Sequence, residues 1–326
     1  MRFEIRIPTY ERPILLLRAL QSLQAQTHRD WRAVVFDDSQ TPDAARIVAD
    51  LKDGRLKYVK NQNSIGAAQN IDQCFSSVPS ADAEFGCLLE DDNYWLPGFL
   101  SLISQRLADG RWNIVLANQR INCEGSGLLP PNETTRGHWF AEGKLSPLQL
   151  RASLLLMEGI SNGGLVWRLT PKVHLQVGSS VKETGLHEAC RTLLIQEDIL
   201  FISEAQAVWT ELPDSMTARA STRYRVIGRG MQAIRDFVLK AQGAEAVQIA
   251  TKSAVRNRLI PSLAFALAYS GHPIEAFRVG GKSSVVGKAL RKGFAIRFAE
   301  SNPCRAFLGS LSEREQNSTC GPSTVT

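Results

Sequence analysis

Long apolar runs are absent from this sequence. No stretch approaches the ~18 uninterrupted apolar residues that a membrane-spanning helix requires. The first residues, Arg2–Ile7, alternate charged and apolar side chains, so the apolar core of a signal peptide is missing there. We therefore expect a cytoplasmic protein, or one that lies peripherally on the inner face of a membrane.

Paired cysteines are also absent. The six cysteines are scattered, without a CxxC pair and without a nearby histidine at zinc-site spacing. They are Cys74, Cys87, Cys123, Cys190, Cys304 and Cys320. We expect reduced thiols at these positions, because nothing in the pattern indicates a disulfide framework or a zinc site.

A dense Lys/Arg stripe is likewise missing. The net charge is +6, and the basic residues concentrate after residue 219. Nucleic-acid-binding domains usually carry a denser stripe with a recognisable motif, so we expect no nucleic acid partner. The excess of positive charge instead favours nucleotide phosphates or phospholipid headgroups as the anionic partner. Hydrophobic residues make up 44% and charged residues 21% of the chain, which excludes disorder for most of its length.

Short apolar strands alternate with helices in the N-terminal part of the chain. The predicted strands are Phe3–Ile7, Trp31–Phe36, Leu56–Val59 and Phe85–Leu89, and the predicted helices include Pro13–Gln26 and Pro42–Leu51. This alternation predicts an α/β fold, in which a mostly parallel central sheet is flanked by helices. Ligands bind beyond the carboxyl ends of such strands, where this chain carries several polar and acidic residues.

Three consecutive carboxylates, Glu90, Asp91 and Asp92, follow the strand at Phe85–Leu89. Adjacent negative charges repel each other, so a cation held against them explains the cluster well. An all-oxygen donor set suits Mn²⁺ or Mg²⁺, which proteins commonly hold with one or two carboxylates and the phosphates of a substrate. The alternative is an acidic surface turn without a ligand.

Five short motifs follow one another along residues 3–100. They are Ile7–Pro13, the leucine-rich helix with Ser22-Leu23 and Gln26-Thr27, Val35–Ser39, Asn63–Asn70 and Leu89–Pro97. Together they resemble the family-2 glycosyltransferases, and the resemblance extends more loosely to residue 217. It implies a GT-A fold over 1–220, with a nucleotide-sugar-binding half at 1–117 and an acceptor-binding half at 118–220.

The C-terminal third of the chain has a different sequence pattern. Apolar residues recur at helical spacing among Arg and Lys, which predicts a helical C-terminal region at 221–305. A basic cluster within it lies beside apolar residues and predicts either peripheral membrane contact or the solvated face of a packed helix. The cluster comprises Lys282, Lys288, Arg291, Lys292 and Arg297. Ser, Thr and Glu dominate the end of the chain, so we expect a disordered tail at 306–326.

The resemblance also implies which residues bind the nucleotide. They are Pro8, Thr9, Tyr10, Arg12, Asp38, Gly66, Asn70 and Glu90. Tyr10 would stack on the base and Asp38 would accept hydrogen bonds from it. The residues themselves leave alternatives open: ordinary packing for Tyr10, a helix N-cap for Asp38 and a plain helix start for Gly66 and Asn70.

The acidic triplet resembles the family's DXD motif, with Glu90 where the family usually has Asp. The resemblance implies that Asp92 binds the metal ion and that Asp91 assists near the sugar. It places a general base near Glu188, with Glu183 and Asp198 as alternatives, and an exposed helix acid is the simpler interpretation of Glu188. It also implies that Ser161–Arg168 edges the sugar pocket and that Trp209–Thr217 closes over the diphosphate.

The resulting prediction is an inverting, metal-dependent glycosyltransferase. It would move a sugar from a nucleoside diphosphate-sugar, with a UDP-sugar preferred, to a sugar or lipid-linked acceptor in polysaccharide or glycolipid biosynthesis. One alternative is a nucleotide-sugar-binding pseudoenzyme. Another is a nucleotidyltransferase, which would be expected to carry a Gly-rich phosphate loop after the first strand, and Pro8–Pro13 is not such a loop.

Overall fold

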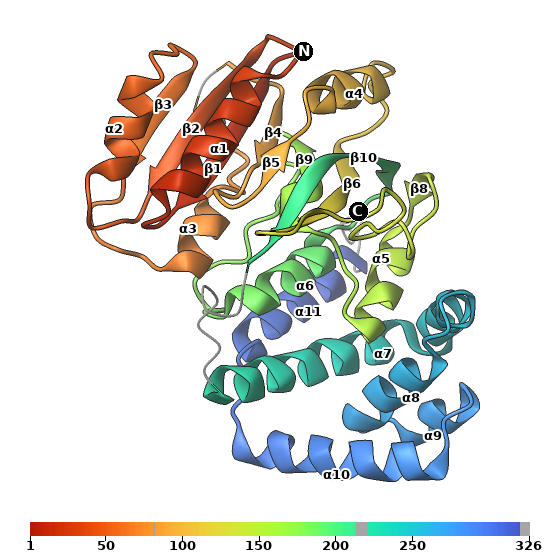
Figure 1. Cartoon of the computed structure of the whole chain (residues 1–326). Helices are drawn as coiled ribbons and strands as arrows, with labels where there is room; N and C mark the ends of the chain where they lie inside the picture. The colour runs from red at the N-terminus through yellow and green to blue at the C-terminus, as the bar shows by residue number, and fades with distance from the viewer. Residues whose placement is uncertain (81, 213–220, 320–326) are drawn as a thin grey trace, which may run out of the picture. The chain divides into compact units, whose positions relative to one another are not determined.

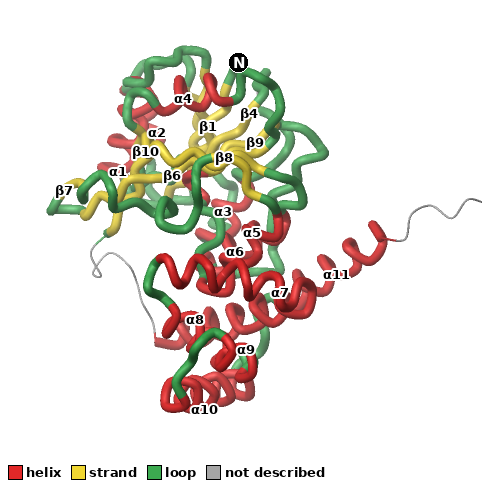
Figure 2. The backbone as a smooth tube through the Cα atoms, turned by 90° about the vertical axis from the view of Figure 1, so that its right-hand side faces the viewer, coloured by secondary structure: helices red, strands yellow, loops and turns green. Residues whose placement is uncertain are grey.

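The computed structural model describes residues 1–80, 82–212 and 221–319, and Figure 1 follows them from red to blue along the chain. Contacts divide the chain into two units. Unit 1 comprises Met1–Pro147, Ile160–Gln176 and Ile195–Ala218, and unit 2 comprises Leu148–Gly159, Val177–Leu194 and Arg219–Thr326. Among the described residues, every strand belongs to unit 1, and the regular structure of unit 2 is helical (Figure 2).

One sheet organises unit 1. Its strands are β1 (Phe3–Thr9), β2 (Trp31–Asp37), β3 (Leu56–Lys60), β4 (Phe85–Leu88), β5 (Tyr94–Trp95), β6 (Ile114–Cys123), β7 (Gly127–Leu128), β8 (Gly143–Leu145), β9 (Leu165–Arg168) and β10 (Ile199–Glu211). The order is β3-β2-β1-β4-β9-β6-β10-β5, while β7 pairs with β6 and β8 pairs with β10. The predicted α/β class with a mostly parallel sheet is confirmed.

The parallel ladder β3-β2-β1-β4 sets the position of the acidic strand ends. Thr9 of β1 lies opposite Asp37 of β2, and Arg6 of β1 lies opposite Leu88 of β4. Because these strands run in the same direction, the loops after β1, β2 and β4 emerge at one edge of the sheet. Strand β9 then pairs antiparallel with both β4 and β6.

Strand β1 is buried along its whole length, including its two charged residues. Arg6 Nη2 lies 2.6 Å from Glu4 Oε1, and Arg6 also donates to the main-chain O of Ser76 and Val78. Ser80 donates to Glu4 Oε2 from its N–H and its hydroxyl. A buried ion pair whose remaining hydrogen-bonding groups are satisfied is tolerated in a core, and here it ties the chain after the third helix to the central strand.

The helices of unit 1 cover the sheet and fill its core. They are α1 (Pro13–Gln24), α2 (Asp43–Asp50), α3 (Ala67–Gln73), α4 (Phe99–Arg106) and the 3-10 turn η2 (Asn162–Gly164). Helix α1 begins at a proline and buries Leu16, Leu20 and Leu23, as the apolar spacing predicts. These leucines join one core cluster with residues of β1, β2, β4 and α4.

Strand β6 is held along its whole length by distant partners. It runs to Cys123 because its second half pairs in parallel with β10. Residues Gln119 to Cys123 lie opposite Ala207 to Glu211 after an irregularity in the β10 register. This pairing partner lies about ninety residues later in the chain, so local sequence patterns could not reveal it.

Unit 2 is a set of helices around its own core. They are α5 (Pro147–Ser153), η1 (Leu154–Leu156), α6 (Thr184–Leu194), α7 (Ser221–Arg256), α8 (Ile260–Tyr269), α9 (Pro273–Arg278), α10 (Ser283–Ala299) and α11 (Arg305–Thr319). Helix α7 is interrupted at Gly243, whose φ of 48° suits a residue without a side chain. Among the described residues, no helix combines the length and the apolar character needed to cross a bilayer.

The end of the chain differs from its prediction. Residues 306–326 were expected to be a disordered tail, but α11 extends to Thr319. Phe307, Leu308 and Leu311 are buried in the core of unit 2, since their spacing places them on one side of a helix. Residues 320–326 lie outside the described residues.

Candidate functional site

A cavity of about 430 Å³ opens at the carboxyl ends of β1, β2 and β4. Its lining residues come from the loops after these strands and from the start of α3. They are Pro8, Thr9, Tyr10, Arg12, Asp38, Ser64, Gly66, Ala67, Asn70, Ile71, Glu90, Asp91 and Asp92. The cavity thus brings together the eight residues predicted to bind the nucleotide and the two aspartates of the acidic triplet. Their roles remain predictions.

Arg12 links the two aspartates of the triplet. Its Nη1 atom lies 2.8 Å from Asp92 Oδ2 and 3.3 Å from Asp91 Oδ1. Thr9 Oγ1 donates to the other oxygen of Asp91 at 2.8 Å. Thr9 ends β1 and Arg12 stands just before α1, so the end of β1 supplies the hydroxyl and the following loop supplies the cation that hold the acids after β4.

The acids of this pair differ in their surroundings. The Asp91 side chain is 7% exposed, whereas that of Asp92 is 21% exposed. Burial and the neighbouring charge of Asp92 raise the pKa of Asp91 to about 6. Burial also raises the pKa of Asp92, against the opposing effect of Arg12. Asp92 is therefore the carboxylate of the pair that faces solvent in the cavity.

Glu90 points toward a pair of glycines from a later segment. Asn93 Nδ2 donates to Glu90 Oε2 at 2.7 Å. A Cβ atom added to Gly163 would lie 3.0 Å from the same Glu90 oxygen, and one added to Gly164 would clash with the main-chain O of Ala117. The backbone at Gly163 therefore lies close to Glu90, and the backbone at Gly164 lies so close to β6 that a side chain there would force a shift. This proximity supports the predicted position of Ser161–Arg168 at the edge of the site.

Asp38 organises the loop before α3. Asn61 Nδ2 and the Ile65 N–H donate to its Oδ1, while Ser64 Oγ and the Gly66 N–H donate to its Oδ2, all at 2.9 Å. Burial works to raise the pKa of Asp38, but these donors hold it below its usual value. Within the described residues, α2 has no side-chain cap, so the capping alternative for Asp38 is not observed.

Asn70 ties α3 to the strand ends. Its Nδ2 donates to the main-chain O of Thr9 at 3.3 Å and of Phe36 at 3.1 Å. Its Oδ1 accepts hydrogen bonds from Asn61 and Gln73. Gly66, at the start of the same helix, has a φ of 80°, which a larger residue would adopt only with strain. A residue that only begins a helix would not need these contacts, so the alternative of a plain helix start does not account for Asn70.

Arg18 was not predicted as part of the site. Its Nη2 donates to the main-chain O of Asp92 at 2.7 Å, and its Nη1 lies 2.8 Å from Glu124 Oε2. The guanidinium also lies over the Tyr94 ring, 5.2 Å from the centroid. The sequence offered one indication of this role, a positively charged residue within the leucine-rich helix Pro13–Gln24. Its partners, however, lie far away in the sequence.

The donor set at this strand end suits a divalent cation by its chemistry. Asp91 and Asp92 offer carboxylate oxygens, the ligands that Mg²⁺ and Mn²⁺ prefer. Arg12 provides the positive charge beside them. Among the residues that the structure describes, no three His, Cys, Asp or Glu side chains converge as a complete metal site. A metal ion here would need further oxygens, such as the phosphates of a bound nucleotide.

The predicted general base lies in the other unit. Glu188 is on α6 of unit 2, where its main-chain O accepts a hydrogen bond from Thr192, whereas all lining residues of the cavity belong to unit 1. Of the alternatives, Asp198 pairs with Lys144 at 2.8 Å and Glu183 precedes α6. The base assignment remains a prediction. In the predicted closing segment, Trp209–Glu211 end β10, and residues 213–217 lie outside the described part of the chain.

Comparison with known proteins identifies related sequences. Residues 4–159 match the family model for glycosyl transferase family 2. GalNAc(5)-diNAcBac-PP-undecaprenol beta-1,3-glucosyltransferase of Campylobacter jejuni is 33% identical over 128 residues. This match covers 38% of the present chain and 40% of the relative, so it concerns less than half of either protein.

Solved structures extend the likeness to the fold. The crystal structure of S. aureus TarS 1-349 has a TM-score of 0.59 at 15% identity, covering 98% of this chain and 92% of that one. The crystal structure of the same TarS 1-349 in complex with UDP-GlcNAc has a TM-score of 0.57 at 14% identity, with the same coverage. The expected GT-A fold is thereby confirmed.

Proposed function

This chain carries a glycosyl transferase family 2 domain over residues 4–159, and from that premise we propose that it transfers a sugar from a nucleoside diphosphate-sugar to an acceptor hydroxyl. One observation carries the proposal. The Asp91–Asp92 pair faces a cavity at the carboxyl ends of parallel strands, with Arg12 as its positive partner. Such a site matches the charge of a diphosphate, provided that a cation is present.

The donor nucleotide would occupy the loops after β1 and β2. Tyr10 is 49% exposed, so its ring is available to stack on a base. Asp38 acts by holding Ser64 and Gly66 at the cavity wall. Direct reading of the base by Asp38 would require one of its four present donors to leave. We propose a UDP-sugar as the donor, and the TarS complex with UDP-GlcNAc supports this choice by fold similarity.

The acidic strand end would hold the diphosphate. A Mn²⁺ or Mg²⁺ ion bound through Asp92 would supply Lewis-acid stabilisation of the leaving group. Arg12 offsets one of the two aspartate charges in the absence of donor, and its 36% exposed side chain would turn toward a phosphate when the donor binds. Thr9 and Asn93 keep Asp91 and Glu90 in place, so the carboxylates need little reorganisation when the donor binds.

The reaction would be a single displacement with inversion at the anomeric carbon. Glu188 would take the proton of the acceptor hydroxyl, and the acceptor oxygen would form its bond to that carbon from the opposite face. The bond from the anomeric carbon to the phosphate oxygen breaks as the diphosphate leaves with the electron pair. The Campylobacter jejuni relative acts on an undecaprenol-linked glycan by its name, which supports a sugar or lipid-linked acceptor in glycolipid or polysaccharide biosynthesis.

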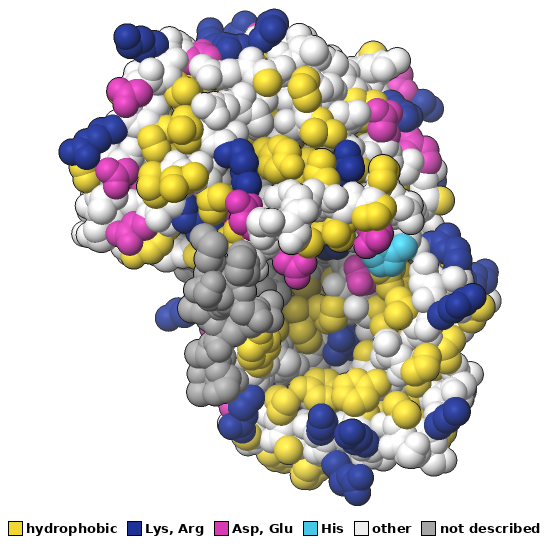
Figure 3. All heavy atoms as spheres, viewed as in Figure 1, with side chains coloured by type: hydrophobic (Ala, Val, Ile, Leu, Met, Phe, Trp, Pro, Cys, Tyr) yellow, Lys and Arg dark blue, Asp and Glu magenta, His cyan; other side chains and the backbone are white. Residues whose placement is uncertain are grey.

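Helix α10 supplies a surface suited to an anionic membrane. Phe294 and Phe298 are 66% and 74% exposed, with ring centroids 4.5 Å apart. Lys288 and Arg291 are exposed on the same helix, and Figure 3 shows Lys and Arg side chains along the lower margin, where Figure 1 places α10. Exposed aromatic rings beside basic residues favour peripheral contact with anionic lipid. The protein would then act on the cytoplasmic face of a membrane.

A donor screen tests the proposal. The purified chain would be incubated with UDP-, GDP- and dTDP-sugars in the presence of Mn²⁺, Mg²⁺ or EDTA, and release of nucleoside diphosphate would be measured. We expect release from one donor class, lost with EDTA. Tight donor binding without release would instead support the pseudoenzyme. In a parallel incubation with nucleoside triphosphates and a sugar phosphate, release of inorganic pyrophosphate would support the nucleotidyltransferase.

A further inference from the structure

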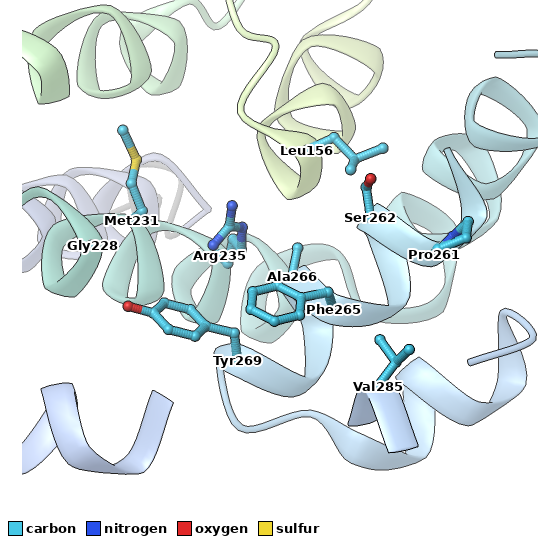
Figure 4. A pocket seen from close by; sticks show the side chains of 10 residues that line it. All are labelled: Leu156, Gly228, Met231, Arg235, Pro261, Ser262, Phe265, Ala266, Tyr269 and Val285. Atoms are coloured by element: carbon cyan, nitrogen blue, oxygen red, sulfur yellow. The ribbon is translucent and has the colours of Figure 1, made fainter. Parts of the chain in front are cut away.

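Unit 2 contains a cavity of about 590 Å³ that has no part in the proposed sugar transfer. Its walls come from η1, α7, α8 and α10, and all of its lining residues belong to this unit. They are Leu156, Gly228, Met231, Arg235, Pro261, Ser262, Phe265, Ala266, Tyr269 and Val285 (Figure 4). The volume lies within the range of small-molecule binding sites.

Arg235 is the charged residue in this lining. It is only 8% exposed, and its side chain rises from α7 into the space near Met231 and Leu156 (Figure 4). Within the described residues its side chain makes one hydrogen bond, from Nε to the main-chain O of Leu155 at 3.0 Å, and has no carboxylate in ion-pair contact. The two terminal nitrogens of the guanidinium are therefore left for a ligand in the cavity.

A buried cation without an anionic partner is energetically costly. Burial lowers the pKa of Arg235 to about 10, against an opposing effect of Tyr269. Buried charges are normally paired, because neither an apolar wall nor a neutral group replaces the lost hydration. An oxyanion facing the two free nitrogens would restore this pairing, and the planar fork of Arg suits a carboxylate or phosphate group.

The rest of the lining suits hydrocarbon. Phe265 and Tyr269 stack with ring centroids 5.9 Å apart and planes at 16°, and Met231, Leu156 and Val285 add aliphatic surface. Gly228 lets the Tyr269 hydroxyl pack close to α7, because a Cβ atom there would lie 2.9 Å from it. The cavity therefore combines an apolar body with a single point of positive charge.

We propose that this cavity binds one anionic amphiphile, with its oxyanion head on Arg235 and its hydrocarbon chain along Phe265 and Tyr269. The charge of Arg235 selects the head and the aromatic wall selects the chain, so neither free phosphate nor a neutral alkyl chain satisfies the site. The proposal stands independently of the sugar transfer, since it depends on unit 2 residues alone.

Calorimetric titration of the full chain tests the proposal with four probes. These are dodecyl phosphate and dodecanoate, both below their micelle-forming concentrations, with dodecanol and inorganic phosphate as the neutral chain and the free head. Three variants accompany the wild type. R235Q removes the charge, S262W fills the cavity from an exposed α8 position, and R278Q removes an exposed charge of α9 outside the cavity.

We expect one molecule of dodecyl phosphate or dodecanoate to bind per chain, at least tenfold more tightly than dodecanol or inorganic phosphate. R235Q and S262W should each weaken this binding at least tenfold, and R278Q should leave it unchanged. S262W keeps Arg235 intact, so it remains informative if R235Q fails to fold. Equal binding of dodecanol or inorganic phosphate, binding unaffected by S262W, or no binding to the wild type would each overturn the proposal.

Discussion

Arg12 Nη1 lies 2.8 Å from Asp92 Oδ2, so the loop after the first strand provides the counter-ion for the acid at the end of the fourth. The same nitrogen also contacts Asp91, whose side chain is almost fully buried. This single cation contacts both carboxylates beside a solvent-accessible cavity, so it offsets only one of their two negative charges. A metal ion and a diphosphate entering together would bring their own charge balance, and Arg12 could then turn to the phosphates.

The first prediction concerns Arg12→Ala. Without metal, the variant should lose about 1–2 kcal/mol of unfolding free energy, because the buried Asp91 and the partly buried Asp92 lose their counter-ion. Mn²⁺ should raise the melting temperature of the variant more than that of the wild type, since the ion replaces the missing charge. Differential scanning calorimetry with and without Mn²⁺ measures both effects. Arg32→Ala, at an exposed position of β2, is the control. An equal Mn²⁺ response in variant and wild type would contradict competition between Arg12 and a metal.

The second prediction concerns Gly163→Ala. The added Cβ atom would press on Glu90 Oε2 and Gln119 Nε2, both 3.0 Å away, and push the Glu90 carboxylate from its place. We expect a cost of about 1 kcal/mol in urea unfolding and a roughly tenfold loss of donor turnover. Gly54→Ala is the matched control, because a Cβ atom there meets no atom within 4 Å. Unchanged turnover in Gly163→Ala would contradict the proposal that η2 lies at the edge of the donor site.

The third prediction concerns pH and the Asp236 carboxylate of α7. Hydrogen bonding by His272 at 3.1 Å, together with Lys240, lowers the pKa of Asp236 to about 2. Because the folded-state pKa lies below the unfolded value, the carboxylate stabilises the fold above about pH 4, and this contribution disappears as the pH falls through about 2. Asp236→Asn should therefore lose about 1–2 kcal/mol at neutral pH and progressively less toward pH 2.5. Urea unfolding across this range measures the difference.

The exposed acid Glu245 on the same helix offers the control for that experiment. Glu245→Gln should leave the unfolding free energy within about 0.5 kcal/mol of the wild type at each pH. If Asp236→Asn and the wild type differed by a constant amount from pH 7 to pH 2.5, the lost interaction would not be one that titrates.

The fourth prediction concerns the surface of α10. Replacing Phe294 and Phe298 together by Ser should reduce sedimentation with vesicles containing anionic phospholipid at least fivefold, because both exposed rings are lost from the interface. Neutral vesicles should bind the wild type weakly, and salt should release it. Ile274→Ser, at an exposed position of α9, is the control. If the double variant sedimented like the wild type, α10 would simply be the solvated face of a packed helix.

Local pattern was enough to predict the strand ends that form the cavity. The strands that end at Thr9, Asp37 and Leu88 can be recognised from the sequence. At each of them a short apolar run is followed within a few residues by polar loop residues and the pattern of the next element. The parallel register then brings these ends together without further information. The part of the cavity lining that follows β1, β2 and β4 is explained in this way, whereas Gly66 and Asn70 were assigned from the family resemblance.

Features that depend on distant partners were not predicted. Arg18 contacts Asp92 and lies 3.3 Å from Thr210, which is almost two hundred residues later in the chain. Asp38 was predicted to accept hydrogen bonds from the base, with a helix cap as the alternative, whereas its observed partners are in a loop that only the fold brings near. The polar composition of α11 led to the prediction of a disordered tail, although Phe307 and Leu311 of this helix are buried. In each case a tertiary contact overrode the local preference.

The most direct test of the central claim is nucleoside diphosphate release by Asp92→Asn in the presence of Mn²⁺. Asp50→Asn, at an exposed position of α2, serves as the control, and circular dichroism verifies the fold of both variants. We predict that Asp92→Asn lowers metal-dependent release at least ~100-fold, with a melting temperature within about 2 °C of the wild type. Release at the wild-type rate with the same Mn²⁺ dependence would contradict the assignment of this strand end as the catalytic site.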